Sequence, residues 1–150
     1  MKYEKYSVRA SGSFRRFTFY SEGPKGRIAK VVLFEAMDKP FINNLAFGDL
    51  TENGDIDDIV VTNNKDTEKV LATIALTIKK FFNAHPGEWL YLKGSTEART
   101  RLYQSAISKN FDFLKGDFEI LGFVNNNWRP FKSGTTYQCF IVGLKKKISL

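Results

Sequence analysis

The sequence predicts a single α+β domain over residues 1–150, with a mostly antiparallel twisted sheet and two main helices, at about 66–83 and 96–109. Three observations support this fold class. Alternating apolar segments separated by turn residues fill the first third of the chain, and similar segments return in the last third. Between them lie two stretches whose apolar residues recur at helical spacing. Because strands and helices are grouped, this pattern favours an α+β arrangement.

Four strands are expected in the first third of the chain, at 14–21, 26–37, 43–50 and 55–63. The segment SEGPKG joins the first two, because Pro24 presets φ and the flanking glycines allow positive φ. Asn53-Gly54 joins the next two and is the strongest short hairpin signal in the chain. Within the second strand, one side is formed by Ile28, Lys30, Val32 and Phe34.

The clearest helix is DTEKVLATIALTIKKFFN, in which Asp66 is a suitable N-cap and His85-Pro86-Gly87 ends the helix. The remaining elements are expected to be a strand at 88–94, the helix at 96–109, and strands at 117–126, 128–131 and 135–144. The strand–helix–strand unit from Ile56 to Leu92 is a candidate for parallel pairing through a right-handed crossover.

The chain carries a net charge of +7, and a basic protein favours acidic partners such as nucleotides, nucleic acid or anionic lipid. Its single cysteine, Cys139, lies in an apolar run and is expected in the core. No secretory signal is visible and no apolar run approaches the length of a membrane span. We therefore expect a cytoplasmic protein without a membrane partner.

The segment GSTEARTRLY (94–103) places two arginines near the start of a helix, where cations are disfavoured by the helix dipole. Ser95 or Thr96 can cap this helix. At about 100° per residue, Arg99 falls inside the apolar arc and Arg101 falls outside it, which predicts that Arg101 is solvated. The apolar arc consists of Ala98, Leu102, Tyr103, Ala106 and Ile107.

An inward guanidinium needs an anionic partner, because an unpaired buried charge is costly. One hypothesis is a site for a phosphate or carboxylate, formed by Ser95, Thr96 and Arg99 at the helix N-terminus. Lys93 and Arg101 would add to its positive field. The alternative is an internal ion pair of Arg99 with an acidic residue of the sheet, with Asp57 and Asp58 as the first candidates.

Other candidate sites are less specific. An acidic run lacks the spacing of an EF-hand, and one histidine and one cysteine cannot form a zinc site, so we expect no metal. The acidic run comprises Asp49, Glu52, Asp55, Asp57 and Asp58. His85 is expected to be a helix-end residue, and its pairing with Cys139 as a nucleophile is not expected.

The N-terminal strands interleave basic and aromatic residues, as single-strand nucleic-acid binders do. The simpler interpretation places the phenylalanines in the core and the cations in solvent. The residues concerned are Arg9, Phe14, Arg15, Arg16, Phe17, Phe19, Tyr20, Lys25, Arg27 and Lys30.

Three segments, FYSEGPKGRIAKVVLF, NLAFGDL with DIDDIVVTNNKDTEKVLATIA, and GSTEARTRLYQSAISKN, resemble a family of small uncharacterised proteins found mainly in Bacteroidetes. The resemblance covers nearly the whole chain and implies a bacterial intracellular protein, but no activity. The layout of residues 56–123 is also similar to the C-terminal half of the acetyl-CoA-dependent N-acetyltransferase fold. That resemblance implies a general-acid role for Tyr103, whose neighbours Ala98 and Leu102 follow the family pattern with spacing off by one residue.

The loop that would receive the pyrophosphate in that fold is NNKDTEKV (63–70), which has no glycine and carries Asp66 and Glu68. We therefore expect no bound cofactor. The leading hypothesis is a phosphate-binding domain for a nucleotide or nucleic acid, using Lys93, Ser95, Thr96, Arg99 and Arg101. The alternatives are a divergent acyltransferase-like or RNA- or nucleotide-directed toxin-like enzyme, and a non-catalytic protein-interaction domain.

Overall fold

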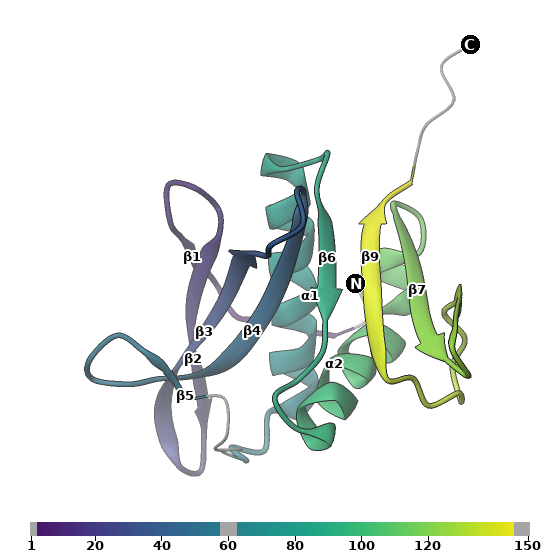
Figure 1. Cartoon of the computed structure of the whole chain (residues 1–150). Coiled ribbons are helices and arrows are strands. Elements are labelled where there is room, and N and C mark those ends of the chain that lie inside the picture. Colours follow the sequence, from purple (N-terminus) through teal and green to yellow (C-terminus); the bar gives the residue numbers. More distant parts are fainter. Residues whose placement is uncertain (1–2, 58–62, 146–150) are drawn as a thin grey trace.

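The computed structural model describes residues 3–57 and 63–145 (Figure 1). Its helices are α1 (Thr67–Ala84), α2 (Glu97–Lys109) and the short α3 (Phe111–Leu114). Its strands are β1 (Arg9–Ala10), β2 (Arg16–Gly23), β3 (Gly26–Ala36), β4 (Ile42–Leu50), β5 (Ile56–Asp57), β6 (Trp89–Leu92), β7 (Phe118–Val124), β8 (Asn127–Pro130) and β9 (Cys139–Leu144). The predicted α+β class and the two main helices are confirmed, whereas α3 was not predicted.

One sheet runs through the molecule in the order β1-β2-β3-β4-β6-β9-β7-β8, with β5 paired to β4. Its pairs are antiparallel except for β4 and β6, which are parallel. The strand at Ile56 and β6 were expected to pair with each other in parallel, and this expectation is wrong. β6 forms its parallel pair with β4, and the strand at Ile56 pairs antiparallel with β4. Both predicted hairpins are present. Pro24 and Lys25 form the turn between β2 and β3, and the connection between β4 and β5 contains Asn53-Gly54.

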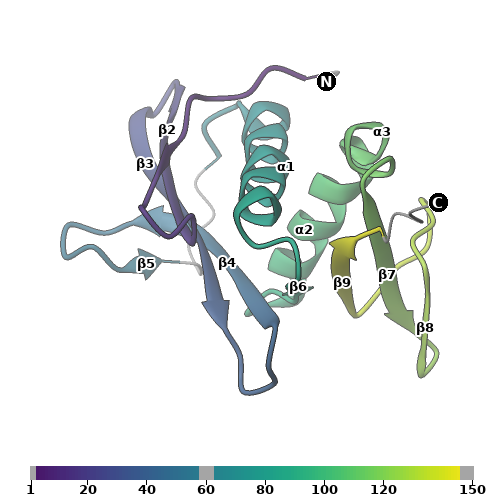
Figure 2. The same cartoon turned by 90° about the horizontal axis from the view of Figure 1, so that it is seen from above.

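All three helices lie on one side of the sheet, which bends around them in two wings (Figure 2). The core between helices and sheet is aromatic: the Phe34 ring of β3 stacks on the Phe81 ring of α1 with centroids 4.4 Å apart. Phe17 and Phe19 of β2 are buried in the same core, as the simpler interpretation of the N-terminal strands predicts, whereas Phe14 is 40% exposed, contrary to that interpretation. In the described residues, no helix is both long and apolar enough to cross a bilayer.

Asp66 occupies the N-cap position of α1, as predicted, but its side chain does not cap the helix. Its carboxylate instead accepts hydrogen bonds from the Tyr6 hydroxyl (2.7 Å) and the Ser21 hydroxyl (2.5 Å). A short acidic side chain can serve either role, and here two hydroxyls from the N-terminal segment and β2 compete successfully for it. Asp66 therefore fixes the start of α1 to the sheet.

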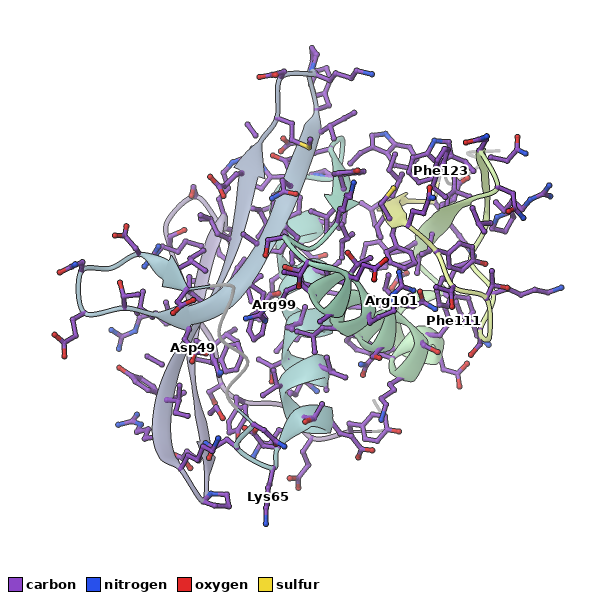
Figure 3. All side chains as sticks on the ribbon, turned by 60° about the horizontal axis from the view of Figure 1, so that its bottom comes forward. Asp49, Lys65, Arg99, Arg101, Phe111 and Phe123 are labelled. Carbon is purple, nitrogen blue, oxygen red and sulfur yellow. The ribbon has the colours of Figure 1, made fainter. Side chains whose placement is uncertain are left out.

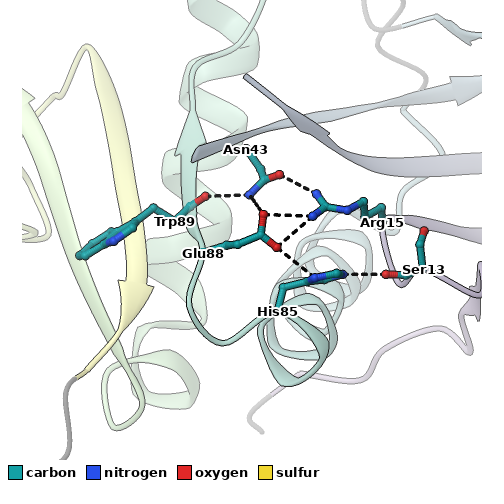
Figure 4. Close-up of polar contacts among 6 residues, drawn as sticks. All are labelled: Ser13, Arg15, Asn43, His85, Glu88 and Trp89. Carbon is teal, nitrogen blue, oxygen red and sulfur yellow. Dashed lines mark hydrogen bonds and ion pairs between the residues drawn. The ribbon is translucent and has the colours of Figure 1, made fainter. Parts of the chain in front are cut away.

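At the other end of α1, a polar network joins the helix to the β1–β2 connection, to β4 and to the residue directly before β6 (Figure 4). His85 is the C-cap of α1, and its ring nitrogens meet the Ser13 carbonyl (2.7 Å) and the Glu88 carboxylate (3.0 Å). Arg15 donates to both oxygens of Glu88 and, at 2.6 Å, to Oδ1 of the fully buried Asn43. The expected helix-end role of His85 is confirmed.

The network predicts a pH-dependent contribution to stability. Burial alone would raise the pKa of Glu88, but hydrogen bonds from Asn43 and Arg15 and the charges of Arg15 and His85 lower it below its ordinary value of 4.5. A lowered carboxyl pKa stabilises the fold above pH 4.5, and this contribution is lost as the pH falls through the lower folded value. We expect Glu88→Gln to lower the free energy of unfolding by about 1.5 kcal/mol at pH 7.

Urea unfolding between pH 3 and pH 7 tests this prediction. The difference between wild type and Glu88→Gln should be constant above about pH 5 and should shrink below pH 4.5. The matched control is Glu22→Gln, because Glu22 is exposed and its carboxylate lies 4.0 Å from Arg27. A difference that did not change with pH would contradict the assignment of the effect to the Glu88 carboxylate.

Candidate functional site

Helix α2 begins directly after a tight connection from β6. Thr96 is the N-cap in extended backbone (φ −135°, ψ 164°), and its Oγ1 accepts a hydrogen bond from the Arg99 backbone N–H at 3.2 Å. The Gly94 N–H donates to Thr100 Oγ1 at 3.0 Å, which folds the connection back onto the first turn. Of the two hydroxyls expected to cap this helix, Thr96 therefore does so, while Ser95 is exposed beside it.

A groove of about 570 Å³ opens at this N-terminus, a volume in the range of small-molecule sites. Its walls come from four parts of the chain: the end of β6 with the following connection, the first turns of α2, the end of β7, and the segment that leads into β9. The groove is lined by Tyr91, Lys93, Gly94, Ser95, Thr96, Glu97, Thr100, Arg101, Phe123, Thr136, Tyr137, Gln138 and Cys139. Four of the five predicted ligand-binding residues thus line one groove.

Arg101 binds the segment that leads into β9 and forms one wall of the groove. Its guanidinium donates to Gln104 Oε1 (2.5 Å) and to the Tyr137 backbone carbonyl, and Gln104 Nε2 donates to the Thr135 carbonyl (2.6 Å). The prediction that Arg101 is a solvated surface charge is therefore wrong. Helical phasing correctly excluded it from the sheet-facing arc, but the β8–β9 connection packs against that flank of α2, a long-range contact that phasing cannot reveal.

Tyr91 of β6 contributes to the lining of the groove. Burial and a hydrogen bond with Cys139 raise the pKa of Tyr91 to about 12. Its hydroxyl is therefore neutral at pH 7 and adds no negative charge to the groove. Cys139 is 7% exposed, which confirms the predicted buried position, although it also contributes to the lining of the groove.

Arg99 points away from the groove, toward the sheet (Figure 3). It is 3% exposed, and its guanidinium carbon lies 5.7 Å from the centroid of the Phe47 ring of β4. The phasing that places Arg99 inward is confirmed, whereas Ala98, assigned to the same arc, is exposed. The predicted ligand-binding set is thus divided, because Arg99 lies on the sheet side of α2 and the other four residues line the groove.

A buried ion pair that the sequence analysis missed lies on the sheet face toward which Arg99 points. Lys30 of β3 is 5% exposed, and its ammonium group contacts the Asp49 carboxylate of β4. Asp57 of β5 is the cross-strand partner of Asp49 and shares its face of the sheet. Pairing of Arg99 with Asp57 or Asp58 stays a prediction, and Asp58 lies outside the described residues.

The signal for this ion pair was present in the sequence. Lys30 shares the parity of Ile28, Val32 and Phe34, which predicts a core-facing side chain. Treating Lys30 as one of the solvated or nucleic-acid-facing cations of the N-terminal strands was therefore wrong. A lysine on an apolar face requires a buried carboxylate, and Asp49 is the residue opposite it in the β3–β4 register.

Tyr103 is 2% exposed and packs between α2 and β4. Its hydroxyl accepts a hydrogen bond from the Phe47 backbone N–H at 3.2 Å. β4 pairs with β6 only from Ile42 to Asn44, so the Tyr103 hydroxyl supplies an acceptor where β4 has separated from β6. Tyr103 does not line the groove, and its role as a general acid stays a hypothesis.

Residues 63–70 are the turn that the resemblance in layout would match to the pyrophosphate loop of an acetyltransferase. This turn is engaged in contacts within the protein. The Asn64 side chain accepts from the Lys25 N–H (2.7 Å) and donates to the Ser21 hydroxyl (3.1 Å) and the Gly26 carbonyl (2.9 Å). These bonds anchor the β2–β3 hairpin to the start of α1. Acetyl-CoA binding therefore stays a hypothesis that these contacts do not favour.

Among residues 3–57 and 63–145, no group of three or more His, Cys, Asp or Glu side chains is arranged to hold a metal ion. The chemical groups that the groove offers include those of its lining side chains and of the helix N-terminus. The groove presents ammonium and guanidinium groups, hydroxyls, a helix N-terminus and aromatic rings, with Glu97 as its acidic residue.

These features describe an α+β domain with a polar groove at a helix N-terminus. A family model described as a family of unknown function, DUF6934, matches residues 2–145, and the chain belongs to this family. No curated protein and no solved structure matches the chain.

Proposed function

We propose that this protein binds a phosphate-bearing ligand in the groove at the start of α2. The observation that carries the proposal is a groove that opens at the start of α2 and has two cationic residues, Lys93 and Arg101, in its lining. Peptide dipoles and the first N–H groups of a helix favour an anion at that position. Lys93 is exposed beside this end, so its ammonium is available to a ligand.

The remaining residues of the groove favour a nucleotide over a bare anion. Tyr91 and Phe123 contribute aromatic rings to the lining, and Ser95 and Thr136 contribute exposed hydroxyls. Aromatic rings stack on bases, whereas hydroxyls donate to phosphate and sugar oxygens. Glu97 is the acidic residue of the rim, and its carboxylate would meet a ribose hydroxyl more favourably than a phosphate.

The proposal predicts that AMP, ATP or inorganic phosphate raises the melting temperature of the protein, and that the rise grows with the logarithm of the ligand concentration above its dissociation constant. We expect Lys93→Ala to weaken AMP binding about tenfold, which corresponds to the loss of one charge-assisted hydrogen bond. Isothermal titration calorimetry at low salt measures this change, and binding should weaken as the salt concentration rises.

Lys39→Ala is the matched control, because Lys39 is an exposed lysine in the β3–β4 loop and does not line the groove. Equal effects of the two substitutions would show that the net charge of the protein, and not this groove, attracts the ligand. Failure of phosphate, AMP and ATP alike to bind at low salt would rule out the proposed function.

A further inference from the structure

The second half of the sheet has an uncovered face. All helices in the described part of the chain lie on the opposite side (Figure 2). Leu90, Val142 and Ile120 are register partners that point to the helices and are at most 6% exposed. Side chains alternate along a strand, so their sequence neighbours point to the uncovered face.

That face carries aromatic side chains in adjacent positions. Phe123 of β7 is the register partner of both Cys139 of β9 and Trp128 of β8, so all three share a face. The Phe123 and Trp128 rings lie 5.1 Å apart at an angle of 57°, and Trp128 is 41% exposed. Tyr91 of β6 is the register partner of Ile141 of β9, two residues from Cys139, so its side chain lies on the same face. We call Tyr91, Phe123 and Trp128 the aromatic row.

The aromatic row leads directly into the groove of the proposed function. Tyr91 and Phe123 belong to both, and Phe123 lies on the opposite side of this wing from Phe111 (Figure 3). Lys93 lies directly after the end of β6, two residues beyond Tyr91, and is exposed. A ligand that fills the groove beside Lys93 can therefore extend over the aromatic rings of the row.

We infer that the ligand is a single-stranded nucleic acid, with one phosphate at the start of α2 and neighbouring bases stacked on the aromatic row. This inference rests on the proposed phosphate-binding function of the groove. Single-strand binders combine aromatic stacking platforms with cations that follow the backbone. Bases in a duplex are stacked on one another and offer only their edges, so a duplex cannot use the row in this way.

The net charge of the chain favours this occupant over a second copy of the protein. The groove and the row carry two cations, Lys93 and Arg101, and two carboxylates, Glu97 and Glu119. The chain as a whole has a net charge of +7, which favours a polyanion. A second copy of this protein would carry the same net charge and is therefore disfavoured.

Fluorescence anisotropy with labelled 12-nucleotide oligo(dT) and oligo(U), at 50 and 200 mM salt, tests the inference. We expect binding that weakens with salt, and a Trp128→Ala variant that binds about 5- to 100-fold more weakly, the range produced by losing one base–aromatic stack. Trp128→Phe should retain most of the affinity. Tyr20→Ala removes a comparably exposed ring (48%) on the distant wing and should have no effect.

The outcomes separate this inference from the proposed function. Binding of AMP without binding of the oligonucleotides would overturn the inference and leave the proposed function intact, whereas failure of both ligands would reject both. A duplex that binds as tightly as the single strand, or an unchanged affinity for Trp128→Ala, would also overturn the inference. Light scattering adds a further outcome: if the protein binds no oligonucleotide and Trp128→Ala converts a dimer to a monomer, the face is an interface between copies.

Discussion

Replacing Lys30 with methionine is expected to lower the free energy of unfolding by about 3–5 kcal/mol, the loss typical of breaking a buried ion pair. Methionine preserves the length and apolar stem of the side chain, so the change isolates the ammonium group. The Asp49 carboxylate, whose side chain is 19% exposed, then loses its lysine on the helix-facing side of the sheet. Urea unfolding monitored by circular dichroism gives the value.

Two further variants identify the cause of this loss. Lys109→Met breaks an exposed pair with Glu68, in which the side chains are 42% and 56% exposed, and should cost at most about 0.5 kcal/mol. The double variant Lys30→Met with Asp49→Leu should recover part of the stability, because it removes both buried charges. If Lys30→Met cost no more than Lys109→Met, the buried pair would not contribute as described.

Substituting Gly94 with alanine is the second change with a large expected effect. A Cβ at this position would lie 2.2 Å from Arg99 Cβ and 2.5 Å from the Thr100 backbone nitrogen, distances that no side-chain rotation relieves. The connection between β6 and α2 would have to move off the first turn. We expect a loss of about 3 kcal/mol of stability, comparable to overpacking a core.

Gly116→Ala is the matched control, because a Cβ at position 116 meets nothing within 4 Å. Thermal unfolding of both variants measures the difference in stability. The same displacement would disturb Thr96 and Lys93, so Gly94→Ala should also weaken AMP binding by more than Gly116→Ala does. Equal stabilities would show that the connection relaxes without strain, contrary to its packing against Arg99.

The local parts of the candidate site were predictable from the sequence. The N-cap of α2, the inward direction of Arg99 and the buried position of Cys139 all follow from spacing along one helix or strand. The same holds for the turn at Pro24 and for the position of α1. Each of these features depends on residues a few positions apart, whose relative directions are set by the helical or strand period.

The remaining parts depend on contacts between distant residues. Arg101 was expected in solvent because no spacing rule connects it to Tyr137, 36 residues away. Asp66 was expected to cap α1, but Tyr6 and Ser21 bind its carboxylate from 60 and 45 residues away. Both errors have one cause, since a polar side chain takes whichever partner tertiary packing brings to it.

The sequence by itself determined the α+β class, the two main helices and the divided directions of Arg99 and Arg101, because periodicity and capping are local properties. Only the tertiary structure decided that Lys30 and Asp49 form a buried pair, and that the β8–β9 connection closes a groove beside the start of α2. Strand order and register bring these residues together, and both are set by the packing of the whole sheet.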